Sequence, residues 1–206
     1  MNDKKHITGI ILAGGKSSRI GSDKGFLVLN EKAFIQHIIE AMQPLVKDII
    51  IVSNNPDYDI LNLKRVNDLI ENSGPLAGIY TGLHHSNTEN NLVLSCDVPL
   101  INTETLKKLT TNIEEHIDVI QLESQGKTMP LIAMYKKHCK NKFLKLLQKG
   151  ERRLRFAVKQ CKVESIVLNK ELEKFTVNIN TQCHLRDLSG FKNLTGLKDN
   201  KHEINH

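Results

Sequence analysis

Two stretches of this sequence place charged side chains where they could bind a nucleotide and a metal ion. Near the start, an apolar run ending at Ala13 leads into a glycine-rich loop that carries Lys16, Arg19 and Lys24. Glycines let a backbone approach a ligand closely, and successive amides in such a loop form a concave anion site. Basic side chains add charge-assisted contacts to phosphate. The loop therefore predicts a cradle for the phosphates of a nucleotide.

The spacing of this loop differs from the two commonest phosphate motifs. Gly21 is not followed directly by Lys and Ser or Thr, so the loop lacks the spacing of a P-loop. The positions of Gly14, Gly15 and Gly21 do not give Gly-x-Gly-x-x-Gly, so a dinucleotide-binding fold is disfavoured. The phosphate site belongs to another class of nucleotide-binding protein.

The second stretch is centred on Asp97, which directly follows an apolar run at residues 92–96. Mg²⁺ prefers carboxylates and substrate phosphates and keeps several of its waters, so one carboxylate at a strand end is chemically sufficient. The alternative is a turn or helix N-cap aspartate, because Pro99 and a predicted helix follow. Asp97 is therefore the candidate metal ligand.

Further polar signals follow other predicted strands. Asn54 lies in a turn after an apolar run, and Asp68 precedes the segment 74–78, Gly-Pro-Leu-Ala-Gly. The glycines permit a tight turn, and the following helix could direct its N-terminus at an anion or a purine. Ligands of open α/β sheets bind beyond the carboxyl ends of the strands. We therefore expect the loop from Gly14, the Asn54 turn and Asp97 to meet at one edge.

Strands and helices alternate along the chain. This pattern predicts a single-domain α/β fold with a mostly parallel, Rossmann-like sheet and helices on both faces. Residues 1–189 form the expected domain, and residues 190–206 an extension that we expect to be partly disordered. Expected strands span 7–13, 48–53, 91–96, 117–123, 127–135, 163–168 and 175–178; expected helices span 34–45 and 74–85, with others beginning near 103 (N-cap Thr103), 136 and 153.

Composition narrows the class of protein. The net charge is +6, but the lysines cluster on one predicted helix and aromatic residues are sparse, which argues against nucleic-acid binding. No apolar run approaches the roughly 18 residues of a membrane span. Four cysteines (Cys96, Cys139, Cys161 and Cys183) are widely scattered, which favours reduced thiols in a cytoplasmic protein over a disulfide framework or zinc site.

The motifs, in their order, resemble those of bacterial nucleotidyltransferases, particularly the molybdenum cofactor guanylyltransferases. Residues 10–24 resemble the family's Leu-Ala-Gly-Gly-x-Ser-x-Arg-Met-Gly-x-Asp-Lys signature, with Ile20 in place of Met. Residues 96–99 (Cys-Asp-Val-Pro) resemble the element that carries the magnesium-binding aspartate. Further similar elements are Gly-Pro-Leu-x-Gly at 74–78, a strand at 129–135 with Met129 where His is usual, Gly-Glu-Arg-Arg at 150–153, and residues 175–181.

The resemblance implies transfer of GMP from GTP to molybdenum-bound molybdopterin, giving molybdopterin guanine dinucleotide and pyrophosphate. It implies Mg²⁺ as cofactor, and cofactor-synthesis proteins and client molybdoenzymes as partners. The roles it implies are catalysis by Arg19, Lys24 and Asp97, with Asp97 also holding the metal; nucleotide binding by Leu12, Ala13, Gly14, Gly15, Lys24, Asn54, Asp68, Gly78 and Asp97; and pterin binding by Arg152, Asn178 and Asn180.

Two alternatives stay open at the level of sequence. A cytidylyltransferase acting on molybdopterin or on another phosphorylated small molecule could share the fold, although Gly14 and Gly15 after Ala13 favour guanine. A nucleotide-binding adaptor that delivers molybdenum cofactor to client enzymes is the alternative without catalysis. The presence of Arg19, Lys24 and Asp97 together argues against the adaptor, because an idle site has no need of all three.

Overall fold

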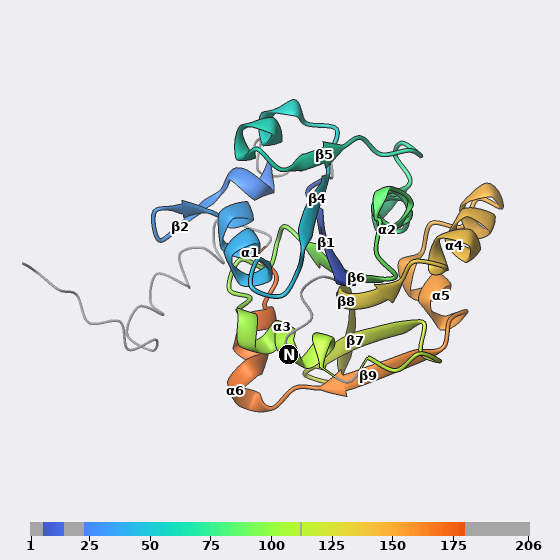
Figure 1. Ribbon diagram of the computed structural model, residues 1–206. Coiled ribbons are helices and arrows are strands. Elements are labelled where there is room, and N and C mark those ends of the chain that lie inside the picture. Colours follow the sequence, from blue (N-terminus) through green and yellow to red (C-terminus); the bar gives the residue numbers. More distant parts are fainter. Residues whose placement is uncertain (1–5, 15–22, 112, 180–206) are drawn as a thin grey trace, which may run out of the picture.

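The computed structural model describes residues 6–14, 23–111 and 113–179. They form one α/β domain around a seven-stranded sheet (Figure 1). The expected fold class is confirmed. The strands are β1 (Ile7–Leu12), β2 (Val28–Leu29), β3 (Lys32–Ala33), β4 (Asp48–Val52), β5 (Lys64–Val66), β6 (Asn90–Ser95), β7 (Val119–Ser124), β8 (Lys127–Lys136) and β9 (Val163–Val167). The helices are α1 (Phe34–Met42), α2 (Gly74–His85), α3 (Thr103–Thr110), α4 (Cys139–Gln148), α5 (Leu154–Lys159) and α6 (Lys170–Glu173), with 3₁₀ turns η2 (Lys24–Phe26), η3 (Pro56–Leu61) and η4 (Lys174–Thr176).

The order of strands in the sheet is β5-β4-β1-β6-β8-β7-β9. Every neighbouring pair is parallel except the two pairs that involve β8. β1 is central, and all six of its residues are buried, as expected for a strand covered on both faces. Because β8 is reversed, its first residues lie at the edge where the other six strands end. That edge holds the candidate site.

Helices cover both faces of the sheet (Figure 1). Successive side chains of a strand point to opposite faces, so Ile11 packs with α1 and α3, whereas Ile10 packs with α2, α4 and α5. The two resulting cores hold the central strands rigidly. None of the helices in the described ranges is long and apolar enough to cross a membrane.

Four local expectations can be compared with the structure. The β7–β8 hairpin turns at Gln125 and Gly126, both with positive φ, as the Gln-Gly pair predicts. The N-cap of α3 is Asn102, whose side chain accepts from the Thr105 amide at 2.8 Å; the expectation of Thr103 was wrong. Residues 175–178 were expected to form a strand but lie in and after the 3₁₀ turn η4. β5 was not expected.

Candidate active site

The carboxyl ends of three neighbouring strands lie level with one another. The Ala13 amide donates to the carbonyl of Val52 at the end of β4 (3.0 Å), and the Cys96 amide donates to the carbonyl of Leu12 at the end of β1 (3.1 Å). The main chain therefore places the start of the glycine-rich loop between the turn after β4 and the Asp97 segment after β6. The expected convergence of these three segments is confirmed.

Asp68 lies against the end of β1. A Cβ at Gly14 would lie 3.7 Å from Asp68 Oδ2, and one at Gly78 would lie 3.8 Å from Asp68 Oδ1 and 3.2 Å from Leu12 Cδ2. The Asn54 side chain accepts from the Asp68 amide at 2.8 Å, which fixes this backbone to the turn after β4. These five residues, all expected in the nucleotide site, are therefore brought together.

The Asp68 carboxylate is prepared to accept further hydrogen bonds. Its Oδ1 is buried and has no hydrogen-bond partner in the structure. Burial, and secondly the negative charge of Glu71, raise the pKa of Asp68 above its ordinary value. A buried polar atom without a partner costs free energy, so its presence at an open edge indicates a place for a ligand donor.

Asp97 lies on the other side of β1, at the end of β6. Its Oδ1 is also buried and without a hydrogen-bond partner. The Asp97 carbonyl accepts from the Ile179 amide at 2.8 Å, which holds the segment 177–179 beside it. In the described part of the chain no three His, Cys, Asp or Glu side chains gather as a metal site. A cation here would therefore depend on one carboxylate and on ligand oxygens.

Lys24 reaches the same region. Burial is the main cause that raises the pKa of the Cys96 thiol to about 12, the negative charges of Asp97 and Asp23 add to it, and the positive charge of Lys24 opposes it. All three charges are therefore close enough to act on one buried thiol. Lys24 and Asp97, expected to be catalytic, therefore both act electrostatically on Cys96.

A cavity of about 940 Å³ opens beside Asp97. Its walls come from the β7–β8 hairpin, the start of α5 and the segment after η4, and they include the expected residue Asn178. Apolar side chains such as Met129, Leu131 and Phe156 alternate with basic ones. The basic lining residues are Lys127, Arg153, Arg155 and Lys159. The cavity therefore suits a ligand with an apolar or aromatic body and negative charge.

Of the arginines in this region, Arg152 lies apart from the cavity lining. Its Nη1 donates to the carbonyl of Asn72 at 2.6 Å. Arg153 is held by Glu151 (Nη2 to Oε2, 2.6 Å), a hydrogen bond that is the main reason the pKa of Glu151 falls to about 2. Arg155, which sequence reasoning missed, donates to Thr128 Oγ1 at 2.8 Å and lines the cavity. Arg155 lies two residues after the Gly-Glu-Arg-Arg motif at 150–153, and this closeness to the motif could have marked it as a candidate site residue.

Three expected site residues, Gly15, Arg19 and Asn180, lie outside the described residues, as does the extension at 190–206. Their roles stay predictions.

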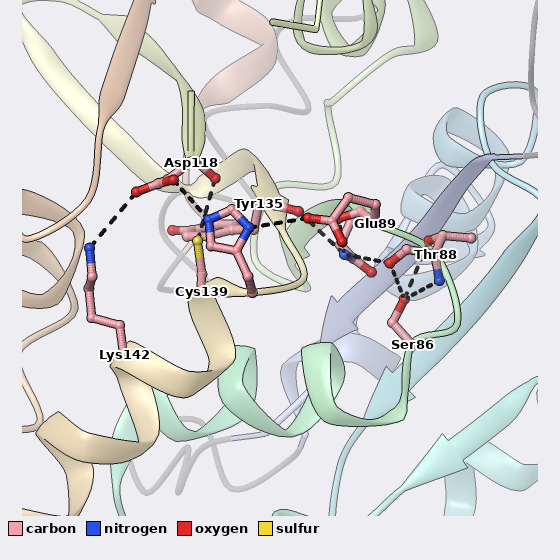
Figure 2. A network of polar contacts seen from close by, with 9 residues as sticks. Ser86, Thr88, Glu89, Asp118, Tyr135, Cys139 and Lys142 are labelled. Carbon is pink, nitrogen blue, oxygen red and sulfur yellow. Dashed lines mark hydrogen bonds and ion pairs between the residues drawn. The ribbon is translucent and has the colours of Figure 1, made fainter. Parts of the chain in front are cut away.

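A separate polar network lies at the opposite end of the sheet, around Asp118 at the start of β7 (Figure 2). His138 bonds to Asp118 through Nε2 (2.8 Å) and to Glu89 through Nδ1 (3.2 Å), and Lys142 lies 3.8 Å from Asp118. Partial burial lowers the pKa of His138, but the two carboxylates outweigh it, so the pKa is raised. This network joins β6, β7 and α4 and takes no part in the candidate site.

Residues 9–164 match the MobA-like NTP transferase domain family. The chain belongs to this family. A Flavobacterium johnsoniae relative, named "probable molybdenum cofactor guanylyltransferase", is 40% identical over 89% of this chain and 96% of its own length. A Vibrio campbellii relative, named "molybdenum cofactor guanylyltransferase", is 31% identical over 84% of this chain and 89% of its own length.

Solved structures share the fold of this chain. A crystal structure from Aquifex aeolicus has 31% identity and a TM-score of 0.74 over 86% of this chain and 95% of that one. Molybdopterin-guanine dinucleotide biosynthesis protein A from Archaeoglobus fulgidus has a TM-score of 0.75 over 89% of this chain and 97% of that one, at 22% identity. The domain match and the named relatives confirm the family expected from the motifs, and the solved structures confirm the fold.

Proposed function

We propose that this protein is a molybdenum cofactor guanylyltransferase, which transfers GMP from GTP to molybdenum-bound molybdopterin and releases pyrophosphate. The names of its relatives support this proposal. The structural observation that carries it is the pair of buried, unpartnered carboxylate oxygens of Asp68 and Asp97 on the two sides of β1. Asp68 would face the nucleoside and Asp97 the phosphates, beside a cavity for the second substrate.

The nucleoside would lie between β1, the Asn54 turn and α2. Guanine carries an N1–H and an exocyclic amine on one edge, and a carboxylate accepts such a pair of donors well. Cytosine presents only its exocyclic amine as a donor on that edge. The free oxygen of Asp68 therefore supports GTP over CTP, with the ribose hydroxyls as alternative donors. Leu12, Ala13, Gly14 and Gly78 would contact the base and ribose at close range.

The phosphates would extend over the glycine-rich loop toward β6. Lys24, together with Gly15 and Arg19, would bind them and the leaving pyrophosphate through charge-assisted hydrogen bonds. The unpartnered Oδ1 of Asp97 fits a Mg²⁺ ligand, because Mg²⁺ takes one or two carboxylates and completes its shell with phosphates and water. Bound Mg²⁺ would neutralise negative charge on phosphate oxygens.

The acceptor would occupy the cavity beside Asp97. Its aromatic and apolar body would pack on Phe156 and Met129, and its terminal phosphate would meet the basic lining residues and Asn178. Arg152 at the neighbouring loop and Asn180 remain proposed pterin contacts. The acceptor phosphate oxygen then attacks the α-phosphorus of GTP, the bond to the β-phosphate breaks, and pyrophosphate leaves. Positioning and charge neutralisation supply most of the catalysis in such transfers.

The reaction would take place in the cytoplasm, where cofactor-synthesis proteins would supply the pterin and molybdoenzymes would receive the product. Three cysteines in the described part of the chain are free thiols, which suits a reducing compartment.

Calorimetric titration with GTP, ITP and CTP, each with Mg²⁺, tests the proposal. We expect GTP to bind most tightly, and ITP, which lacks the exocyclic amine, to bind more weakly. Asp68→Asn should reduce GTP affinity by about tenfold or more and narrow the preference over CTP, since a buried charged acceptor is lost. Preferred binding of CTP would instead assign a cytidylyltransferase, and equal binding of all three would remove Asp68 from base selection.

Turnover then separates an enzyme from a nucleotide-binding adaptor. Pyrophosphate release should require GTP, Mg²⁺ and the pterin together. Lys24→Ala should lower turnover by more than about tenfold with the fold intact, and Asp97→Asn should abolish the Mg²⁺-dependent rate. GTP binding without any pyrophosphate release would favour the adaptor.

A further inference from the structure

Asp23, the residue before Lys24, is held at both carboxylate oxygens. Its Oδ1 accepts from the Gly25 amide at 3.0 Å and from the Tyr58 hydroxyl at 2.5 Å. Its Oδ2 accepts from Asn55 Nδ2 at 3.2 Å. Hydrogen bonds to an ionised carboxylate are about twice as strong as neutral ones. The backbone on which Lys24 stands is therefore fixed to a segment more than 30 residues further along the chain.

Tyr58 is itself immobile. It is fully buried, and its ring stacks on Phe26 with the centroids 4.5 Å apart. Burial, and then the bond to Asp23, raise the pKa of Tyr58 far above its ordinary value, so the hydroxyl stays protonated and donates. A Cβ at Gly25 would lie only 2.1 Å from this hydroxyl. The absence of a side chain at Gly25 is what lets Tyr58 reach Asp23.

Asn55 is aimed at Asp23 by its own contacts. Its side-chain Oδ1 accepts from the Asp57 backbone amide at 3.0 Å, and its own backbone amide donates to Ser53 Oγ at 3.1 Å. Its Nδ2 is thereby left to donate to Asp23. The preceding residue, Asn54, holds the Asp68 backbone. One turn after β4 therefore fixes both ends of the candidate nucleotide site.

We propose that Tyr58 and Asn55 are positioning residues that clamp Asp23 and thereby hold the backbone of Lys24 beside the turn after β4, where its side chain can meet the triphosphate. The role of Lys24 in the reaction rests on the proposed function, whereas the clamp on Asp23 does not. A fixed backbone keeps the Cα of Lys24 within reach of the phosphates, so that on binding only the side-chain torsions must be ordered and not the main chain as well. Neither Tyr58 nor Asn55 needs to touch the nucleotide.

Tyr58→Phe is the sharpest test, because it removes one hydroxyl and keeps the buried ring. Tyr135→Phe is a matched control for the lysine-reactivity readout: that ring is also fully buried, and its hydroxyl donates to the Pro130 carbonyl at 2.7 Å, in the cavity wall and not beside Asp23. Each variant loses one buried hydrogen bond, and Tyr58→Phe should lose more stability because its acceptor is a carboxylate, so both proteins are compared well below their melting temperatures.

The first readout needs no nucleotide. The full-length proteins are treated with a limiting amine-acylating reagent, and the rate at each lysine is measured by mass spectrometry. Lys24 is half-buried. We expect it to react several times faster in Tyr58→Phe than in wild type or Tyr135→Phe, while Lys32, which pairs with Glu40, reacts equally in all three. An unchanged rate at Lys24 overturns the clamp.

The second readout is turnover of GTP and the pterin, well below the melting temperature. Tyr58→Phe should lower kcat/KM for GTP by about five- to tenfold, which is less than the full value of a hydrogen bond to a charged group because Tyr58 acts only through Lys24. The same substitution in a Lys24→Ala background should have no further effect, because its target is gone. An equal loss in both backgrounds overturns the link to Lys24. If wild type neither binds nor turns over GTP, the proposed function fails, and the acylation rates still decide the clamp.

Discussion

Gly82→Ala should destabilise the protein although alanine is the better helix former. A Cβ at this position in α2 would lie 2.4 Å from Cγ2 and 2.9 Å from Cδ1 of Ile10 on β1. Ile10 is fully buried and β-branched, so it cannot turn its side chain away. Replacing glycine by alanine within a helix stabilises the helix by about 1 kcal/mol. Overpacking a dense core costs about 1–3 kcal/mol, and contacts this short belong at the upper end.

The net expectation is a loss of about 1–2 kcal/mol in the free energy of unfolding, or about 2–8 °C in Tm for a domain of this size. To relieve the contact with Ile10, α2 should move away from β1. Gly78 lies one turn earlier on the same face of α2, so it would move away from Leu12, and GTP affinity should fall as well. Thermal melts followed by circular dichroism and calorimetric titration with GTP measure the two effects.

A double variant isolates the cause. In Gly82→Ala/Ile10→Ala the offending methyl groups are absent, so the combined destabilisation should be smaller than the sum of the single losses by about 1 kcal/mol or more. A Gly82→Ala protein that melts at or above the wild-type temperature would refute the reasoning, because helix propensity would then outweigh the contact with Ile10.

The remaining predictions concern a histidine and two thiols. Because the pKa of His138 is raised in the folded protein, its bonds with Asp118 and Glu89 stabilise the fold fully below about pH 6.5, the pKa of a free histidine. This stabilisation is lost as the pH rises through the folded-state pKa of His138. His138→Gln should therefore lower Tm more at about pH 5.5 than at about pH 8.5. The difference should be small, because the imidazole is largely exposed; a larger loss at the higher pH contradicts the assignment. Cys96, buried and with its pKa raised to about 12, should resist alkylation at neutral pH in the folded protein. Cys161, half-buried and with its pKa lowered by a neighbouring thiol, should react faster than Cys96, as peptide mass mapping would show.

The central strands could be predicted from the sequence because burial on both faces leaves a short apolar run, at residues 10–12 in β1 and 49–52 in β4. β5 could not, because it has three residues, Lys64, Arg65 and Val66, two of them charged. It is a strand only because it pairs with β4, and three residues are too few for an alternating hydrophobic pattern that would predict this pairing. Residues 175–178 gave the opposite error. Thr176 is β-branched, yet its hydroxyl donates to the Glu173 carbonyl at 2.8 Å and closes a turn.

The meeting of strand ends at one edge also followed from the sequence, since parallel strands share their carboxyl edge. The contacts that support this edge did not. Tyr58 and Asp23 are 35 positions apart, and Arg155 and Thr128 are 27 apart. No local spacing encodes such pairs, because they exist only once the sheet has brought their segments together.

The reversed direction of β8 has a consequence for how such a site can change. The hairpin at residues 124–132 forms much of the cavity wall as one contiguous stretch of chain. The proposed nucleotide side, in contrast, is assembled from strand ends scattered between Leu12 and Asp97. A different hairpin would therefore change the cavity wall through one short replacement and leave these strand ends in place. On the proposed function, hairpins grafted from relatives should change which acceptor is used while nucleotide binding is kept.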